Sequence, residues 1–240
     1  MEKEKNKRVE LRPLTKEEEE QIDSLFRSGR EDEKISELPT AEVNRGDVHL
    51  LKPGRWLNDE VINFYMEILK IRQKNNPNLP KCHFFGTFFY TQLCNGPENY
   101  DFSKVKRWTN KVDIFSLDKV ILPVHLGNHW CCAVINFKDK QFQYFDSLLG
   151  DNRECLKKLR RYVADEMVNR SKQGIVNLDE FKDSIPKDIP IQSNGYDCGV
   201  FMCKYAEFSS RGSELNFTQK DITQYRRRIA LELYLKKILD

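Results

Sequence analysis

One segment of the chain combines a thiol and a side-chain amide with the start of a helical pattern. The stretch 192–199 places Cys198 at the start of an apolar helical run, with the side-chain amide of Gln192 six residues upstream. Unpaired N–H groups and the positive end of the helix dipole stabilise negative charge at a helix N-terminus. Because the thiolate is the nucleophilic form of cysteine, the segment predicts a catalytic cysteine at position 198.

A nucleophilic cysteine needs a base, a group that orients the base, and donors for the developing oxyanion. His129 is predicted to open a β-strand and Asp146 to end the next strand of the same hairpin, so antiparallel pairing can bring them side by side. A carboxylate beside an imidazole holds one ring N–H and leaves the other nitrogen for the sulfur. The side chain of Gln192 and the backbone N–H of Cys198 are the predicted oxyanion donors.

Each of these residues also has an ordinary structural interpretation. A cysteine in an apolar helix is commonly a buried small hydrophobe, which is the interpretation for Cys155 and Cys203. A single histidine such as His129 can be structural, and Asp146 alone could be a turn residue. Cys198 differs because it lies at the start of its helix, and because all the required partners occur with it in one chain.

Metal binding is the competing chemistry. His125 and His129 are spaced as HxxxH, and Cys131 and Cys132 follow at once. A helical zinc pair of this kind needs a glutamate after the first histidine, and the residues 126–128, Leu-Gly-Asn, argue against a helix. No metal site and no cofactor are therefore predicted.

Composition excludes several classes of function. The 240 residues include 40 Lys plus Arg and 37 Asp plus Glu, so the balance gives no support for nucleic-acid binding. The basic run 226–228 lies within a helical pattern and predicts a solvated face. Seven cysteines without a CxxC pair fit neither a disulfide framework nor a zinc ribbon, and indicate a reducing compartment.

No apolar run approaches the length of a membrane span, and the chain opens on charged residues rather than a signal peptide. These features predict a soluble intracellular protein with no membrane insertion. The charged start also suggests that a longer N-terminal region has been removed.

Capping and periodicity predict helices that flank a small central sheet, which is an α+β domain. The predicted helices are 16–27, capped by Thr15 with Glu18, one from Asn58 to about 75–77, one at 100–108, one from Asp151 with Glu154 to about 171, and one from Thr218 with Asp221. The predicted strands are 120–125, 130–137 and 141–146, whereas 84–93 is ambiguous between helix and strand. A single domain is predicted, with a helix and polar loop over 1–50 leading into a catalytic domain over 51–240.

Several ordered motifs from about Trp56 onward resemble the SUMO-specific cysteine proteases, also called sentrin-specific or ubiquitin-like-protein-processing peptidases. The motifs are Trp56-Leu-Asn-Asp-Glu-Val-Ile-Asn-Phe-Tyr, Lys106-Arg-Trp-Thr, Pro123-Val-His-Leu-Gly-Asn-His-Trp130, Tyr144-Phe-Asp-Ser147, Asp197-Cys-Gly199 and Asn216-Phe-Thr218. The resemblance implies a papain-like fold with a small mixed sheet. It also implies Cys198 as nucleophile, His129 as base, Asp146 as its orienting partner and Gln192 as oxyanion donor.

The resemblance further implies how a substrate is held. Trp56 and Trp130 would form a narrow tunnel for a Gly-Gly tail, since two indole faces around an extended chain leave room only for residues without a side chain. The family's modifier-docking surface falls on the four positions Asp59, Phe88, Arg107 and His125.

The activity implied is a thiol protease that cleaves after the C-terminal Gly-Gly of SUMO. Its partners would be the SUMO precursor, which it matures, and SUMO-conjugated proteins, which it releases from lysines. A monomer in the nucleus or at its envelope is expected by analogy with the family. Two alternatives remain open: a protease for another ubiquitin-like modifier such as Nedd, and a non-catalytic module that binds SUMO.

Overall fold

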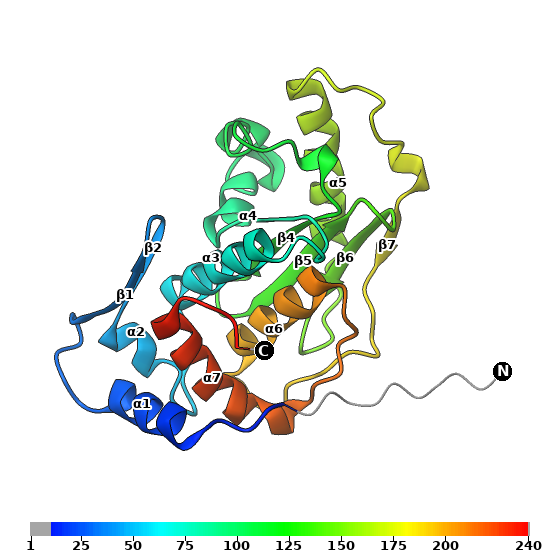
Figure 1. The fold of residues 1–240 in the computed structure, drawn as a ribbon. Coiled ribbons are helices and arrows are strands. Elements are labelled where there is room, and N and C mark those ends of the chain that lie inside the picture. The colour runs from blue at the N-terminus through cyan, green and yellow to red at the C-terminus, as the bar shows by residue number, and fades with distance from the viewer. Residues whose placement is uncertain (1–10, 240) are drawn as a thin grey trace.

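A five-stranded mixed sheet lies at the centre of the computed structural model, which describes residues 11–239 (Figure 1). The three middle strands are antiparallel to one another, and each edge strand is parallel to its neighbour. The strand order is β3 (Cys82–Phe84), β4 (Lys119–His125), β5 (Trp130–Asn136), β6 (Gln141–Phe145) and β7 (Lys182–Ser184). The prediction of a strand followed by a hairpin over 120–146 is therefore confirmed.

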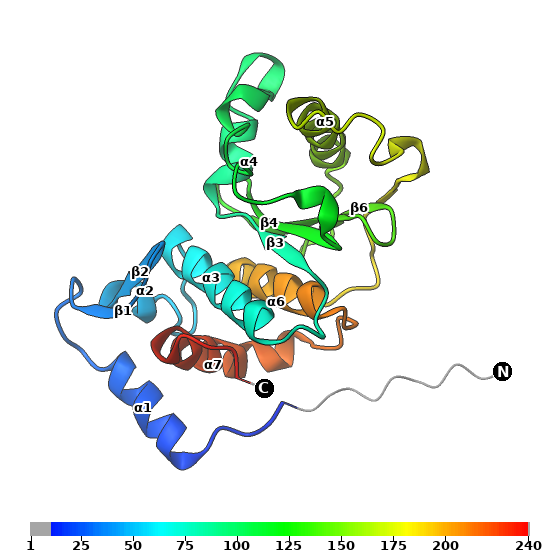
Figure 2. The ribbon, with the colours of Figure 1, turned by 45° about the horizontal axis from the view of Figure 1, so that its top comes forward.

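Helices cover both faces of the sheet, which confirms the α+β class (Figure 2). On one side lie α3 (Asp59–Asn75), α6 (Cys198–Arg211) and α7 (Ile222–Leu235), and on the other lie α4 (Phe88–Leu93) and α5 (Arg153–Asn169). Alternate residues of β5 serve the two cores: Cys132 and Val134 join the first, while Cys131, Ala133 and Ile135 join the second. Both faces of β5 are buried, so its sequence is a continuous apolar run.

The N-terminal region holds more structure than the sequence predicted. Helix α1 (Lys16–Phe26) begins at Thr15 with the predicted capping box to Glu18. The prediction of a loop after it was wrong, because β1 (Lys34–Leu38) and β2 (Ala41–Asn44) form a hairpin that leads into the short helix α2 (Arg45–His49). The strand pattern is weak, because β1 does not alternate, β2 alternates over only four residues, and Val43 is the one fully buried apolar side chain of the hairpin.

Side-chain caps set the N-terminal boundaries of α3 and α5. Asn58 caps α3 as predicted, through a hydrogen bond from the Val61 N–H. The predicted cap of α5 at Asp151 was wrong by one residue, because the Asn152 side chain accepts from the Cys155 N–H, whereas Asp151 pairs with Arg153.

The prediction of a helix over 100–108 was wrong. The ambiguous segment 84–93 divides between the end of β3 and helix α4, and 100–108 holds only a 3₁₀ turn at Phe102–Lys104. The capping box of Thr218 and Asp221 opens a 3₁₀ turn that continues into α7, as predicted.

The structure also bears on the predictions about the cysteines, membrane-spanning helices and the basic run 226–228. All seven cysteines are free thiols, and Cys155 and Cys203 are buried. Over residues 11–239 no helix is both long and apolar enough to cross a bilayer. The prediction of a solvated basic face at 226–228 was wrong, because Arg226 and Arg228 are only 2% and 3% exposed.

Candidate active site

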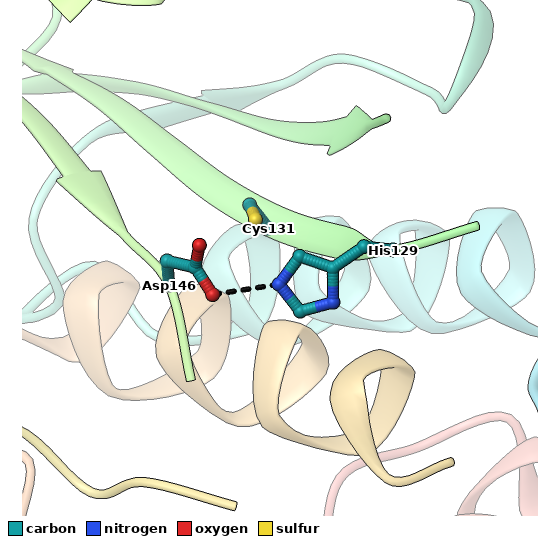
Figure 3. Close-up of side chains that lie close together, drawn as sticks. All are labelled: His129, Cys131 and Asp146. Atoms are coloured by element: carbon teal, nitrogen blue, oxygen red, sulfur yellow. Dashed lines mark hydrogen bonds and ion pairs between the residues drawn. The ribbon is translucent and has the colours of Figure 1, made fainter. Parts of the chain in front are cut away.

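His129 and Asp146 meet at one end of the central hairpin, as the strand pairing predicted. The last pair of β4 and β5 joins His125 to Trp130, so His129 lies in the turn just before β5. Asp146 directly follows β6, whose Phe145 pairs with Cys132. The Nε2 atom of His129 donates to Oδ1 of Asp146 over 2.6 Å (Figure 3).

The Asp146 carboxylate is itself held by its own loop. Oδ1 accepts from the Leu148 N–H over 2.8 Å, and Oδ2 accepts from the Gly150 N–H over 3.2 Å. A Cβ at Gly150 would lie 2.3 Å from Oδ2, so only glycine permits this approach. Burial alone would raise the pKa of Asp146, but the hydrogen bonds from His129 and from these two amides lower it below its ordinary value.

The imidazole is biased toward its charged form. Hydrogen bonding to Asp146, and then to the thiols of Cys131 and Cys198, raises the pKa of His129 well above its ordinary value. Since Nε2 faces the carboxylate, Nδ1 is the ring nitrogen left for a thiol. The arrangement can therefore hold an imidazolium beside a thiolate, which is the reactive form of a cysteine nucleophile.

Cys198 is the first residue of α6 and is 3% exposed. Asp197 precedes it as the N-cap residue, yet its side chain makes no capping hydrogen bond to the helix. The Asp197 carbonyl accepts the Val200 N–H, so the Cys198 and Gly199 N–H groups and the helix dipole are left to stabilise an anion at the sulfur. At Gly199 a Cβ would lie 2.8 Å from the Cβ of Leu57, so the start of the helix packs directly on the segment that follows Trp56.

Gln192 lies beside the same loop as Asp146. Its backbone N–H donates to the Ser147 carbonyl over 3.0 Å, and its Oε1 accepts from the Ser147 hydroxyl over 2.6 Å. Its Nε2 donates to the Asn194 carbonyl. Because Ser147 holds Oε1, the amide is turned so that Nε2 remains the donor end. The sequence prediction included Gln192 but missed Ser147, although it is the last residue of the Tyr144-Phe-Asp-Ser147 motif.

The Cys131 thiol also lies beside the His129–Asp146 pair (Figure 3). One ligand atom each from His129, Cys131 and Asp146 falls within 4.8 Å of the others. Ligands at about 2.0–2.1 Å from a tetrahedral zinc ion stand roughly 3.3 Å apart. The 2.6 Å between Nε2 and Oδ1 is a hydrogen-bond distance rather than a ligand separation. Binding a metal here would therefore require the pair to open.

The other buried thiols are held in their neutral form. Burial raises the pKa of Cys131, Cys132 and Cys203 above the ordinary value for cysteine. For Cys82 and Cys155 burial raises the pKa to about 12. A thiol that stays protonated at neutral pH is a poor nucleophile, so these cysteines are structural.

A cleft of about 390 Å³ brings together most of the predicted substrate-binding residues. Trp130 is 7% exposed, stacks on His125 with ring centroids 4.1 Å apart, and donates its Nε1–H to the Leu57 carbonyl over 3.0 Å. The cleft lining also includes Trp56, Asp59 and Phe88. Trp56 and Phe88 are 52% and 54% exposed, so both have room to contact a bound protein.

Arg107 stands apart from this group. Its side chain is exposed and does not line the cleft. The neighbouring Trp108 is 38% exposed, and its ring contacts those of Phe85 and Phe89. The structure thus brings together five of the six predicted substrate-binding residues.

Comparison of the sequence with models of protein families identifies the family of the chain. The model of the Ulp1 protease family, C-terminal catalytic domain, matches residues 55–238. The chain belongs to the Ulp1 protease family. The match begins at the loop before Trp56 and includes Cys198, His129, Asp146 and Gln192.

Individual relatives agree with this membership. Ubiquitin-like-specific protease 1A of Arabidopsis thaliana is 39% identical over 92% of this chain and 45% of its own length. The sentrin-specific protease of Caenorhabditis elegans is 38% identical over 91% of this chain and 31% of its own length. Human sentrin-specific protease 2 is 36% identical over 99% of this chain and 40% of its own length. The chain therefore spans less than half the length of these Ulp1-family relatives.

Solved structures agree on the fold. The yeast Ulp1 protease domain, solved in complex with Smt3, the yeast ortholog of SUMO, has a TM-score of 0.79 and 31% identity over 93% of this chain and 96% of that one. A second structure, the SUMO protease Ulp1 with its catalytic cysteine oxidised to a sulfinic acid, has a TM-score of 0.76. The papain-like Ulp1 fold implied by the sequence is confirmed.

Proposed function

We propose that this chain is a thiol protease that cleaves after the C-terminal Gly-Gly of a SUMO-type modifier. It matures the SUMO precursor and releases SUMO from lysines of modified proteins. The observation that carries the proposal is the position of Cys198 at a helix N-terminus beside a His129–Asp146 pair. The names of the relatives, and the Smt3 bound to the yeast domain, supply the substrate class.

The reaction is acyl transfer in two halves. The Cys198 thiolate attacks the carbonyl carbon of the terminal glycine, and the oxyanion that forms accepts hydrogen bonds from the Gln192 side chain and the Cys198 N–H. The C–N bond then breaks, and the leaving amine takes a proton from the His129 imidazolium. Water attacks the resulting thioester with His129 as the base, which releases the modifier and regenerates the thiol.

The cleft between Trp56 and Trp130 holds the Gly-Gly tail. Trp130 is fixed by its hydrogen bond to Leu57 and by stacking on His125. A fixed wall beside an extended backbone excludes side chains larger than a hydrogen atom. Replacing either glycine of the tail by alanine would therefore prevent cleavage, while the body of the modifier still docks.

Docking uses the exposed rim of the cleft and the surface beside it. Phe88 offers an exposed apolar face, and Asp59 supplies a carboxylate at the start of α3. Arg107 adds a cation outside the cleft. These residues suit the mixed apolar and charged surface of a protein partner.

The proposal is tested with SUMO, Nedd and ubiquitin, each fused through its C-terminal Gly-Gly to a reporter. SUMO is expected to be cleaved fastest. Faster cleavage of Nedd or ubiquitin would assign the chain to another modifier. Binding of SUMO without cleavage of any fusion would support the non-catalytic module, against which the presence of Cys198, His129, Asp146 and Gln192 together argues.

The docking surface makes a separate prediction. Phe88→Ala and Asp59→Ala should each weaken SUMO binding by about 1–3 kcal/mol, because each truncates a side chain at the centre of the contact. The measurement is KM for the SUMO fusion beside cleavage of a short Gly-Gly peptide. The peptide lacks the body of the modifier that these two side chains hold, so its cleavage by each variant should match cleavage by the wild type. Equal losses on both substrates would place these residues in the catalytic machinery instead.

Gln192→Ala should lower kcat by about 10²–10³-fold, the usual cost of one oxyanion donor. KM should change little, since the donor acts on charge that develops only in the transition state. Ser147→Ala is the companion variant, because it frees the amide without removing it, and it should lose less. A Gln192→Ala enzyme with normal kcat would show that the oxyanion is bound elsewhere.

The proposal also covers the domain organisation, the oligomeric state and the location of the protein. Residues 51–240 form the catalytic domain, with 1–50 as an N-terminal extension, and the protein acts as a monomer inside the cell. The nucleus or its envelope is the proposed site of action, by analogy with the family alone.

A further inference from the structure

The strongest unexplained feature of the fold is a buried arginine behind the nucleophile. Arg226 lies on α7, and its side chain is 3% exposed. Its Nε donates to Oδ1 of Asp197 over 2.8 Å, and its Nη2 lies 2.7 Å from the same oxygen. Burying a guanidinium is costly unless each of its N–H groups finds an acceptor, so the rest of its contacts are informative.

The remaining N–H groups of Arg226 bind backbone carbonyls on two different segments. Nη1 reaches the carbonyls of Leu50 and Lys52 at 3.0 and 3.3 Å. Nη2 reaches those of Arg55 and Tyr196 at 2.8 and 3.2 Å. One planar group therefore joins the loop 50–55 to the turn before Cys198. A lysine could not replace it, because its three donors diverge from a single nitrogen.

The contact with Asp197 explains why this residue does not cap its own helix. Oδ2 of Asp197 accepts from Asn194 Nδ2 over 2.7 Å and from Gln219 Nε2 over 2.8 Å, while Oδ1 faces Arg226. An aspartate at an N-cap normally accepts from the N–H groups of the first turn. The Asp197 carbonyl accepts the Val200 N–H, so with the carboxylate held away the Cys198 and Gly199 N–H groups remain for the sulfur and the oxyanion. The guanidinium compensates the charge of this carboxylate, which lies on the residue next to the nucleophile.

The loop held by Arg226 leads directly into the substrate cleft. Residues 50–55 precede Trp56, and the next residue, Leu57, accepts the Trp130 indole N–H and packs on the start of α6 at Gly199. The position of the loop therefore affects one wall of the cleft and the first turn of the nucleophile helix together.

We infer that Arg226 is a positioning residue that sets the helix carrying Cys198 and the cleft wall at Trp56 at the same time. The inference deepens the proposed function and rests on it for the role of the cleft, but not for the state of the thiol. Arg226 touches no substrate. It acts through Asp197 on one side and through the loop 50–55 on the other.

The test uses Arg226→Met, with Arg228→Met as the matched control. Arg228 lies two residues further along α7, is 3% exposed, and donates to the carbonyls of Arg12 and Leu239, far from the nucleophile in the chain. Both variants remove a buried guanidinium from the same helix. Circular dichroism and thermal melting establish the folded fraction, to which every rate is normalised.

Arg226→Met should slow iodoacetamide alkylation of Cys198 about tenfold, because the Asp197 carboxylate, on the residue next to Cys198, loses the guanidinium that compensates its charge. Alkylation is followed by mass spectrometry of the Cys198 peptide and requires no modifier. The same variant should raise KM for the SUMO fusion and lower kcat/KM about 10²-fold, since misplaced reacting groups cost rate steeply. Arg228→Met should change neither quantity.

The double variant Arg226→Met with Asp197→Asn separates the effect on Cys198 alkylation from the effect on KM. It also provides the test if Arg226→Met alone does not fold. Without the carboxylate, the alkylation rate should return toward the wild-type value. KM should stay raised, because the loop 50–55 is still released. If alkylation and KM in the Arg226 variants match those of Arg228→Met, the positioning role is wrong. If alkylation follows the expected pattern but the wild type cleaves no SUMO fusion, the proposed substrate fails and the positioning of the thiol stands.

Discussion

Replacing Cys198 by alanine should abolish cleavage, with a loss in kcat on the order of 10⁶-fold, as when another covalent nucleophile is removed. The thiol is the group that forms the acyl intermediate, and among the described cysteines only Cys198 is the first residue of a helix. Cys155 lies in the first turn of α5, but its N–H is taken by the Asn152 cap and burial raises its pKa to about 12. Binding of the modifier should survive, since the cleft and its rim are untouched. The measurement is single-turnover cleavage of a SUMO fusion, with binding followed by titration.

A SUMO carrying a C-terminal electrophile provides the matched control. It should form one adduct with the wild type and none with Cys198→Ser, which keeps the side chain but lacks the reactive thiolate. Cys131→Ser should still be labelled, although this thiol lies close to His129 and Asp146. An adduct on Cys131 in the Cys198→Ser protein would mean that the nucleophile has been misassigned.

Asp146→Asn should lower kcat by about 10⁴-fold while the modifier still binds, because an amide at this position no longer fixes the imidazole tautomer. The hydrogen bond to Asp146 is the largest cause of the raised pKa of His129. Without it the pKa falls, so the ring loses its proton at a lower pH. The alkaline limit of the remaining activity should accordingly move to lower pH, which a pH profile of kcat measures.

Asp151→Asn is the control for this change. Asp151 lies five residues further along the same loop, is exposed, and pairs with Arg153 rather than with the imidazole. It should leave kcat and the pH profile unchanged. Near-normal turnover in Asp146→Asn would show that another residue orients His129, and an equal loss in both variants would indicate a disturbed loop rather than a lost carboxylate.

Local signals in the sequence predicted the elements that carry the site. Capping boxes fixed the starts of α1 and of the turn into α7, and Asn58 fixed the start of α3. The apolar runs of β4 and β5 marked two buried strands, and pairing then required His129 and Asp146 to approach. Such signals are readable because they depend on residues a few positions apart, or on neighbouring strands joined by a short turn.

Long-range contacts account for what the sequence did not reveal. The β1–β2 hairpin was missed because β1 does not alternate and β2 alternates over only four residues, while Val43 is buried in a core that it shares with distant elements. The separation of Arg107 from the cleft likewise depends on how the segment 100–112 folds over α4 and α5.

The clearest division between sequence and structure lies at the run 226–228. By composition it is a basic surface, and the acceptors that satisfy the buried Arg226 lie far from it in the sequence. Asp197 lies 29 residues away, and the carbonyls of the loop 50–55 lie more than 170 residues away. The sequence alone determined which residues could perform thiol chemistry and the order in which they occur. Only the tertiary structure decided which charges are buried behind them, because the cost of burying a charge is set by partners that the fold brings together.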